Sequence, residues 1–164
     1  MISRLILFVI GFFIWTMLSW PPDLQHAIVG VIVAAFVAFI TGDLFTSRPA
    51  NFAHITRYLW FAYYVPVFLW ECFKANIDVA LRVLNPKMPI KPGIVKVKTS
   101  LKSDTALTFL ANSITLTPGT FCVDVKPKEG VLYIHWINVK STDTEQATKL
   151  IVEKFEGILK RIFE

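Results

Sequence analysis

Four ionisable side chains recur at helical spacing near the middle of the chain. They are Glu71, Lys74, Asp78 and Arg82. This spacing places them on one face of a helix, where opposite charges can form ion pairs. Ionisable groups within a membrane often mark ion pathways, so Glu71 and Lys74 are candidates for a proton relay. Because the four residues lie where apolar sequence gives way to polar sequence, a ladder of interfacial salt bridges is favoured, and the relay is the alternative.

His135 is another residue whose type suits catalysis, and it stands beside Trp136 in a segment that predicts a strand. General acid–base catalysis needs a positioned partner. No second His, Cys or paired carboxylate lies nearby in the sequence, so a structural role is favoured. The polar segment from Ser113 to Thr120 lacks the lysine and the glycines of a phosphate-binding loop.

The two cysteines occur in different settings. Cys72 ends an apolar run, whereas Cys122 lies within a predicted strand. This arrangement is typical of small half-buried hydrophobic residues rather than of a disulfide or a metal site. The sequence therefore predicts no enzyme, no bound metal and no cofactor.

The composition indicates a membrane part joined to a soluble part. Of the 164 residues, 54% are hydrophobic and 18% are charged, whereas soluble domains have about 25% charged residues. Of the 17 Lys and Arg residues, only Arg4, Arg48 and Arg57 precede residue 60. Nucleic-acid binding is not predicted, because aromatic stacking platforms and basic clusters on one element are missing. Attraction to anionic lipid explains the lysine-rich residues 87–102 more simply.

Residues 1–48 are predicted to form a membrane hairpin of two helices. The first apolar stretch runs from Leu5 to Trp20, and prolines 21 and 22 interrupt it. Asp23 can cap a second helix from Leu24 to about Phe45. A secretory signal peptide is the competitor for the first stretch, but a small-residue cleavage site is missing. The ridge of small residues Gly30, Ala34, Ala35 and Ala38 indicates either close packing of another helix or merely the usual alanine content of membrane helices.

Residues 49–85 are predicted to form a third membrane helix with a charged cytoplasmic extension. An aromatic-rich apolar stretch from about Phe52 to Phe73 favours packing against large protein neighbours. Pro66 should kink this helix, which we expect to end before Asn85 and Pro86. The lysines beyond it place the C-terminal part in the cytoplasm. Three crossings then put Arg4 and Arg48 outside the cell, which conflicts with the rule that Lys and Arg gather on the cytoplasmic side.

Residues 86–164 are predicted to form a small cytoplasmic α+β domain in the order β-α-β-β-α. Period-two alternation predicts a strand at 94–98, and two further strands at 121–125 and 131–139 should form a hairpin. Ser103 can cap a helix with its apolar positions at 107, 110, 111 and 114, and Thr142 opens a capping box for one last helix. Residues 117–120 match a type II turn.

Three stretches of the chain resemble the MrpE (MnhE, PhaE) family, the E subunits of multisubunit Mrp-type cation/proton antiporters. They are residues 74–86, the specific run Asn-Ser-Ile-Thr-Leu-Thr-Pro-Gly-Thr at 112–120, and His-Trp-Ile at 135–137. The resemblance covers nearly the whole chain in order and spacing. The candidate interface residues in and beside these stretches are Glu71, Lys74, Asn76, Asp78, Asn112, Ser113, Thr117, Pro118, Gly119, Thr120, His135 and Trp136.

The resemblance implies a non-catalytic accessory subunit of a Na⁺/H⁺ antiporter in the cell membrane, with other Mrp-type subunits and the lipid bilayer as partners. Related E-type subunits occur in Mrp-like modules of membrane-bound hydrogenase and sulfur-reducing complexes, so the host complex stays open. Two further hypotheses come from the residues themselves. One is direct ion conduction through Glu71 and Lys74, and the other is ligand sensing by the polar segment 112–120.

Overall fold

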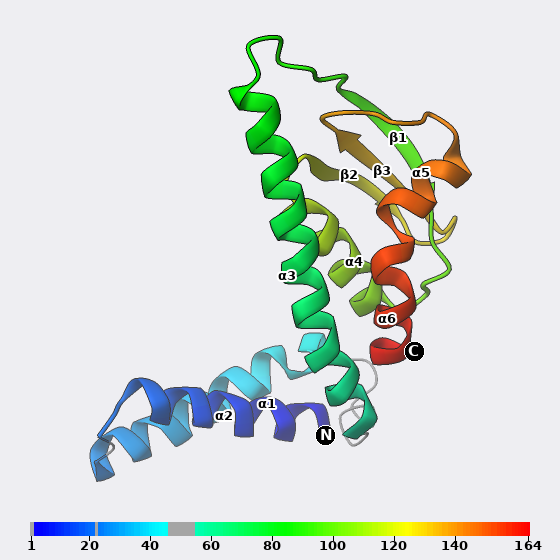
Figure 1. Cartoon of the computed structure of the whole chain (residues 1–164). Coiled ribbons are helices and arrows are strands. Elements are labelled where there is room, and N and C mark those ends of the chain that lie inside the picture. The colour runs from blue at the N-terminus through cyan, green and yellow to red at the C-terminus, as the bar shows by residue number, and fades with distance from the viewer. Residues whose placement is uncertain (1, 22, 46–54) are drawn as a thin grey trace. The chain divides into compact units, whose positions relative to one another are not determined.

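The structure is a computed structural model that describes residues 2–21, 23–45 and 55–164 (Figure 1). The chain divides into two compact units, Met1–Ala53 and His54–Glu164. The second unit joins the long helix α3 (Ile55–Leu84) to the three-stranded sheet. The molecule is mostly helical with one small antiparallel sheet, as the sequence predicted in outline.

The first unit is a pair of packed helices, α1 (Ile2–Leu18) and α2 (Leu24–Phe45). Asp23 begins α2 as predicted, because its Oδ1 accepts a hydrogen bond of 2.7 Å from the backbone N–H of His26. Three of the four ridge residues face α1: Ala34 and Ala38 are buried, and a Cβ added to Gly30 would collide with Trp15. Ala35 is exposed. The close-packing interpretation of the ridge is therefore confirmed within this hairpin.

Among the described helices, α2 has the length and composition to cross a membrane. Its residues Leu24–Thr41 form an 18-residue stretch with a mean hydropathy of 2.2. The apolar stretch of α1, Ser3–Leu18, is shorter, and α3 contains no stretch of this kind. The predicted set of three membrane helices is thus supported by length and composition for one helix.

Helix α3 is built into the second unit rather than standing apart from it. Tyr64 lies in the core of this unit, and Trp60 and Phe68 pack against that core. The aromatic side chains predicted to need large protein neighbours therefore find some of them in their own chain. The helix ends at Leu84, immediately before Asn85 and Pro86, as expected.

The sheet contains β1 (Gly93–Lys98), β2 (Thr120–Lys126) and β3 (Val131–Trp136) in the order β1-β3-β2, with both pairings antiparallel. The predicted β2–β3 hairpin is confirmed, although β3 ends at Trp136 rather than residue 139. A bulge between Cys122 and Asp124 shifts the register of β2. In β1, the side chains of Val95 and Val97 are buried, whereas the residues that alternate with them are exposed. One face of the sheet therefore meets the core.

Three further helices complete the second unit. Helix α4 (Asp104–Leu116) begins at Ser103, whose side chain accepts from the backbone N–H of Ala106, as predicted. The single C-terminal helix predicted from the sequence is wrong, because α5 (Thr144–Ile151) and α6 (Glu153–Phe163) are separate. At the junction, the Phe155 N–H donates to the carbonyl of Val152, three residues back. Both side chains are fully buried there, so the turn directs two helical faces at one core.

The cap of α5 also differs from the prediction. Asp143, not Thr142, accepts the hydrogen bond from the backbone N–H of Gln146. Asp is preferred over Thr at the N-cap position of a helix, and here the two residue types are adjacent in the sequence.

The core lies behind the sheet, between β1, β3 and the helices of the second unit. Its apolar members include Val95, Val97, Leu107, Leu110, Ile114, Leu132, Ile134, Ile151, Val152, Phe155 and Leu159.

Candidate functional site: a cleft between α3 and the 117–120 turn

A cleft of about 390 Å³ lies between α3, the turn that follows α4, the end of β3 and the α5–α6 junction. It gathers residues from three candidate segments that are far apart in the sequence. The candidate residues that line it are Glu71, Lys74, Asp78, Thr117, Pro118, Gly119, Thr120 and Trp136. The structure therefore unites two thirds of the twelve candidates at one place.

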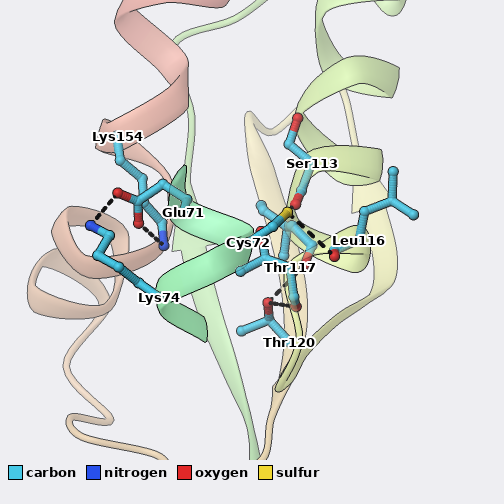
Figure 2. Close-up of polar contacts among 9 residues, drawn as sticks. Glu71, Cys72, Lys74, Ser113, Leu116, Thr117, Thr120 and Lys154 are labelled. Carbon is cyan, nitrogen blue, oxygen red and sulfur yellow. Dashed lines mark hydrogen bonds and ion pairs between the residues drawn. The ribbon is translucent and has the colours of Figure 1, made fainter. Parts of the chain in front are cut away.

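The wall opposite α3 is the type II turn at 117–120, as predicted. Gly119 has φ of 88°, and the Thr120 N–H donates to the Thr117 carbonyl at 3.2 Å. The Thr117 hydroxyl donates to the carbonyl of Ser113 at 2.7 Å, and the Thr120 hydroxyl donates to the carbonyl of Ile114 at 2.7 Å (Figure 2). Both hydroxyls thus bind carbonyls in the last turn of α4, where helices leave acceptors to be satisfied by other groups.

Glu71 lies on the α3 wall between two lysines (Figure 2). Its Oε1 is 2.5 Å from Nζ of Lys74, and its Oε2 is 3.4 Å from Nζ of Lys154 on α6. The Glu71 side chain is 17% exposed. The Glu71–Lys74 pair of the predicted ladder is confirmed, and Lys154 adds a link between α3 and α6 that spans 83 residues of sequence.

Asp78 and Arg82 form the second pair of the ladder. Arg82 donates from Nε and Nη2 to the two carboxylate oxygens of Asp78, at 2.8 and 2.9 Å, and from Nη1 to the carbonyl of Pro89 at 2.7 Å. The hydrogen bond from Arg82 and its charge, with that of Lys140, hold the pKa of the Asp78 carboxyl below its ordinary value, although burial opposes this. The guanidinium also ties the end of α3 to the segment that leads into β1.

The remaining candidates lie outside the cleft. Asn76 and Asn112 are exposed, and the Asn76 amide donates to the carbonyl of Cys72 on its own helix. Ser113 is 1% exposed and lies behind the turn, where its Oγ is 2.5 Å from the hydroxyl of Tyr64. His135 is exposed between Ile94 and Phe121 of the neighbouring strands. Adjacent residues of a strand face opposite ways, so His135 and Trp136 are separated by the sheet.

Sequence reasoning missed the residues that join α3 to the rest of the unit. Lys154 and Phe155 on α6 contact α3 through an ion pair and through rings: the Phe155 ring lies 6.5 Å from that of Tyr64 and 6.3 Å from that of Phe68. The apolar periodicity of residues 147–162 showed that a face of this segment is buried, but not which helix covers it.

We next consider the groups in the described residues that could bind a metal ion or react as a nucleophile. Within the described ranges there is no group of three or more His, Cys, Asp or Glu residues that could hold a metal ion. The thiols of Cys72 and Cys122 are free, and burial together with the charge of Asp124 raises the pKa of Cys122. The arrangement of satisfied hydroxyls and paired charges is what a rigid junction between α3, α4 and α6 requires.

Comparisons with known proteins agree over most of the chain. The family model described as "Na+/H+ ion antiporter subunit" matches residues 8–162. The chain is 34% identical to the E subunit of the Na(+)/H(+) antiporter of Bacillus subtilis over 154 residues, covering 92% of this chain and 91% of that protein. Its identity to the corresponding protein of Alkalihalophilus pseudofirmus is 38% over 117 residues, 71% of each chain.

A solved structure resembles the whole chain. It belongs to the membrane-bound sulfane sulfur reductase (MBS), described as an archaeal respiratory membrane complex. One of its chains superimposes with a TM-score of 0.86 and 44% sequence identity, covering 99% of this chain and 100% of that one.

Proposed function

The chain belongs to the family of Na⁺/H⁺ antiporter E subunits, and on this premise we propose that it is a non-catalytic accessory subunit of a multisubunit cation/proton antiporter complex. It supports the assembly and transport of the complex and does not conduct ions itself. The observation that carries this proposal is the pairing of charge in the cleft. Glu71 is neutralised by Lys74 and Lys154, and Asp78 by Arg82. Opposite charges this close favour the charged form of both carboxylates, whereas a carboxylate that relays protons must gain and lose them.

The membrane location rests on the first unit. Helix α2 fits a crossing by length and composition, and α1 packs against it as the second helix of a hairpin. The C-terminal unit is cytoplasmic in this proposal, because the segment after α3 contains Lys87, Lys91, Lys96 and Lys98. Its partners are the other subunits of the complex and the lipid bilayer.

A second host complex is favoured by the structural comparison. The identity of 44% with a chain of the sulfane sulfur reductase exceeds the 34% shared with the antiporter protein of B. subtilis. The alternative is therefore an E-type subunit in the antiporter-like module of a membrane-bound hydrogenase or sulfur-reducing complex. We propose the same accessory role in either host complex, because the proposal rests on the cleft and the hairpin of this chain.

Isolation of the chain with its partners tests the proposal. An affinity tag on the full-length chain, expressed at its native level, allows purification in mild detergent and identification of the proteins that accompany it. We expect antiporter subunits, and a hydrogenase or iron–sulfur protein among them would select the alternative host. Recovery of the chain, expressed at its native level, without any other subunit would contradict both.

A further inference from the structure

Helix α3 has two different sides. All of its charged residues, Arg57, Glu71, Lys74, Asp78 and Arg82, fall on the half of the helix centred on Tyr64, at about 100° of rotation per residue. The opposite side is an uncharged stripe along the whole helix. We call it the outer stripe, and it consists of Ile55, Leu59, Ala62, Pro66, Leu69, Phe73, Ile77, Ala80 and Leu84. Every residue of the outer stripe is exposed in the described chain.

The inner side of α3 contacts the rest of the second unit over a long distance. Near its start, Trp60 lies under the guanidinium of Arg161, 4.2 Å from the ring centroid. Near its end, Val79 lies against the turn at Gly119. From Trp60 to Val79 the helix rises about 29 Å, at about 1.5 Å per residue. This length equals the thickness of a hydrocarbon core, roughly 30 Å.

This contact rules against a bilayer crossing by α3. Helix α6 lies alongside α3 from Lys154, which pairs with Glu71, to Arg161, which covers Trp60. It exposes Glu153, Lys160 and Arg161 to its surroundings. If α3 crossed the membrane, these charges would enter the hydrocarbon with it, which is strongly unfavourable. The same helix α3 also lacks an apolar stretch long enough to span.

The composition of α3 suits the membrane surface instead. Helices that lie in the interface combine an apolar face, often with Trp, Phe and Leu, with a charged face. Tyr58, Tyr63 and Trp70 flank the outer stripe and are 51%, 54% and 59% exposed. Such aromatic side chains favour the level of the lipid headgroups. Nine residues separate Phe45, at the end of α2, from Ile55, and nine residues of extended chain reach at most about 30–33 Å.

We propose that α3 lies in the plane of the cytoplasmic membrane interface, with the outer stripe in contact with lipid, and that the chain crosses the membrane only twice. This inference rests on the membrane location proposed above. It replaces the third crossing predicted from the sequence, and it removes the conflict over orientation. With two crossings, both ends of the chain are cytoplasmic. The external turn between α1 and α2 then contains neither Lys nor Arg, and all 17 of these residues lie on the positive side.

Spin labels at three positions of the outer stripe test the geometry. The complex is purified with Leu59→Cys, Leu69→Cys or Ile77→Cys, one at a time, in a chain that also carries Cys72→Ser and Cys122→Ala. It is reconstituted in vesicles of phosphatidylethanolamine and phosphatidylglycerol, and each label is probed with oxygen and with a water-soluble nickel chelate. Asn112→Cys, on the exposed side of α4, is the matched aqueous control.

An in-plane helix gives three labels at one shallow depth. The ratio of oxygen to nickel accessibility should agree within about twofold among the three positions, and should exceed that of Asn112→Cys several-fold. A depth that changes steadily from Leu59 to Ile77 would overturn the inference in favour of a crossing. Exclusion of both reagents would overturn it in favour of a protein partner on the outer stripe.

The number of crossings is measured independently on the unsubstituted chain. Reporter domains that are active only in the cytoplasm are fused to the N-terminus or the C-terminus of the full chain. Two crossings predict activity from both fusions, whereas activity from the C-terminal fusion alone contradicts the inference. A chain that is recovered in the soluble fraction contradicts the proposed membrane location itself, so the two failures are distinguishable.

Discussion

The hydrogen bond between Tyr64 and Ser113 should contribute measurably to holding α3 on α4. Ser113 donates its single hydroxyl proton to the carbonyl of Phe109, so the Tyr64 hydroxyl must donate to Ser113 Oγ. Both side chains are buried, at 7% and 1% exposure. Ser113→Ala strands a buried donor and should lower the free energy of unfolding by about 1–3 kcal/mol. Tyr64→Phe removes the donor itself and should cost only about 0.5–1.5 kcal/mol.

The double variant distinguishes this bond from two separate effects. Once Tyr64 is Phe, no donor is left unsatisfied by Ser113→Ala, so the combined loss should fall short of the sum by about 1 kcal/mol. The assay is urea unfolding of the full chain in mild detergent, followed by circular dichroism. Thr108→Ala is the matched control, because Thr108 makes the same backbone bond on the exposed side of α4 and should add independently to Tyr64→Phe. If the effects of Tyr64→Phe and Ser113→Ala add within about 0.3–0.5 kcal/mol, the two hydroxyls do not stabilise the fold through a shared hydrogen bond.

Three further predictions concern the second unit. Gly119→Ala should cost about 1–3 kcal/mol in thermal unfolding, because φ is 88° and the new Cβ would lie 2.9 Å from Ile137, whereas Gly157→Ala, which meets nothing, should stabilise by about 0.5–1 kcal/mol. Phe155→Ala should cost about 3–5 kcal/mol, against less than about 0.5 for the exposed Phe121→Ala, in the same urea assay. The third prediction concerns Glu164. Burial raises the pKa of its carboxyl, but hydrogen bonds from the backbone N–H groups of Lys102 and Ser103 outweigh burial and hold that pKa below its ordinary value. Its stabilisation is therefore present above the unfolded value of about 4.3 and is lost as the pH falls below it, and Glu164→Gln should show less of this loss in unfolding curves compared between neutral and acid pH. Equal changes in stability for the two glycine variants, or for the two phenylalanine variants, would contradict the packing described for those residues. An unchanged loss of stability at acid pH in the Glu164→Gln variant would contradict the hydrogen bonds described for Glu164.

The features predicted correctly are those whose causes lie within a few residues. The caps at Asp23 and Ser103 depend on a side-chain oxygen reaching a backbone N–H three positions ahead. The turn at Pro118 and Gly119 depends on two backbone angles that these residue types favour. The cysteines, by contrast, gave no positive signal, and the family resemblance rather than any local pattern identified residues 112–120.

The features that the sequence did not predict depend on which helix packs against which. The pair of Glu71 and Lys154 joins residues 83 positions apart, and nothing in the sequence of α6 selects α3 as its neighbour. For the same reason, the sequence predicted α3 as a membrane helix and did not predict its packing against α6. Its aromatic residues predicted large protein neighbours, and its apolar content predicted a membrane. The structure shows that Trp60, Tyr64 and Phe68 find such neighbours in the same chain. The outer stripe stays exposed, and we propose that lipid covers it.

Ion transport by a complex without the Glu71–Lys74 ion pair tests most directly whether this chain conducts ions. Glu71→Gln and Lys74→Met are introduced together in the full chain, and cation-driven proton movement is measured in vesicles and divided by the amount of assembled complex. If the chain supports the complex without conducting ions, transport per assembled complex should equal that of the unsubstituted complex. Loss of transport from a fully assembled complex would show that these side chains carry ions and would contradict the proposed non-conducting role.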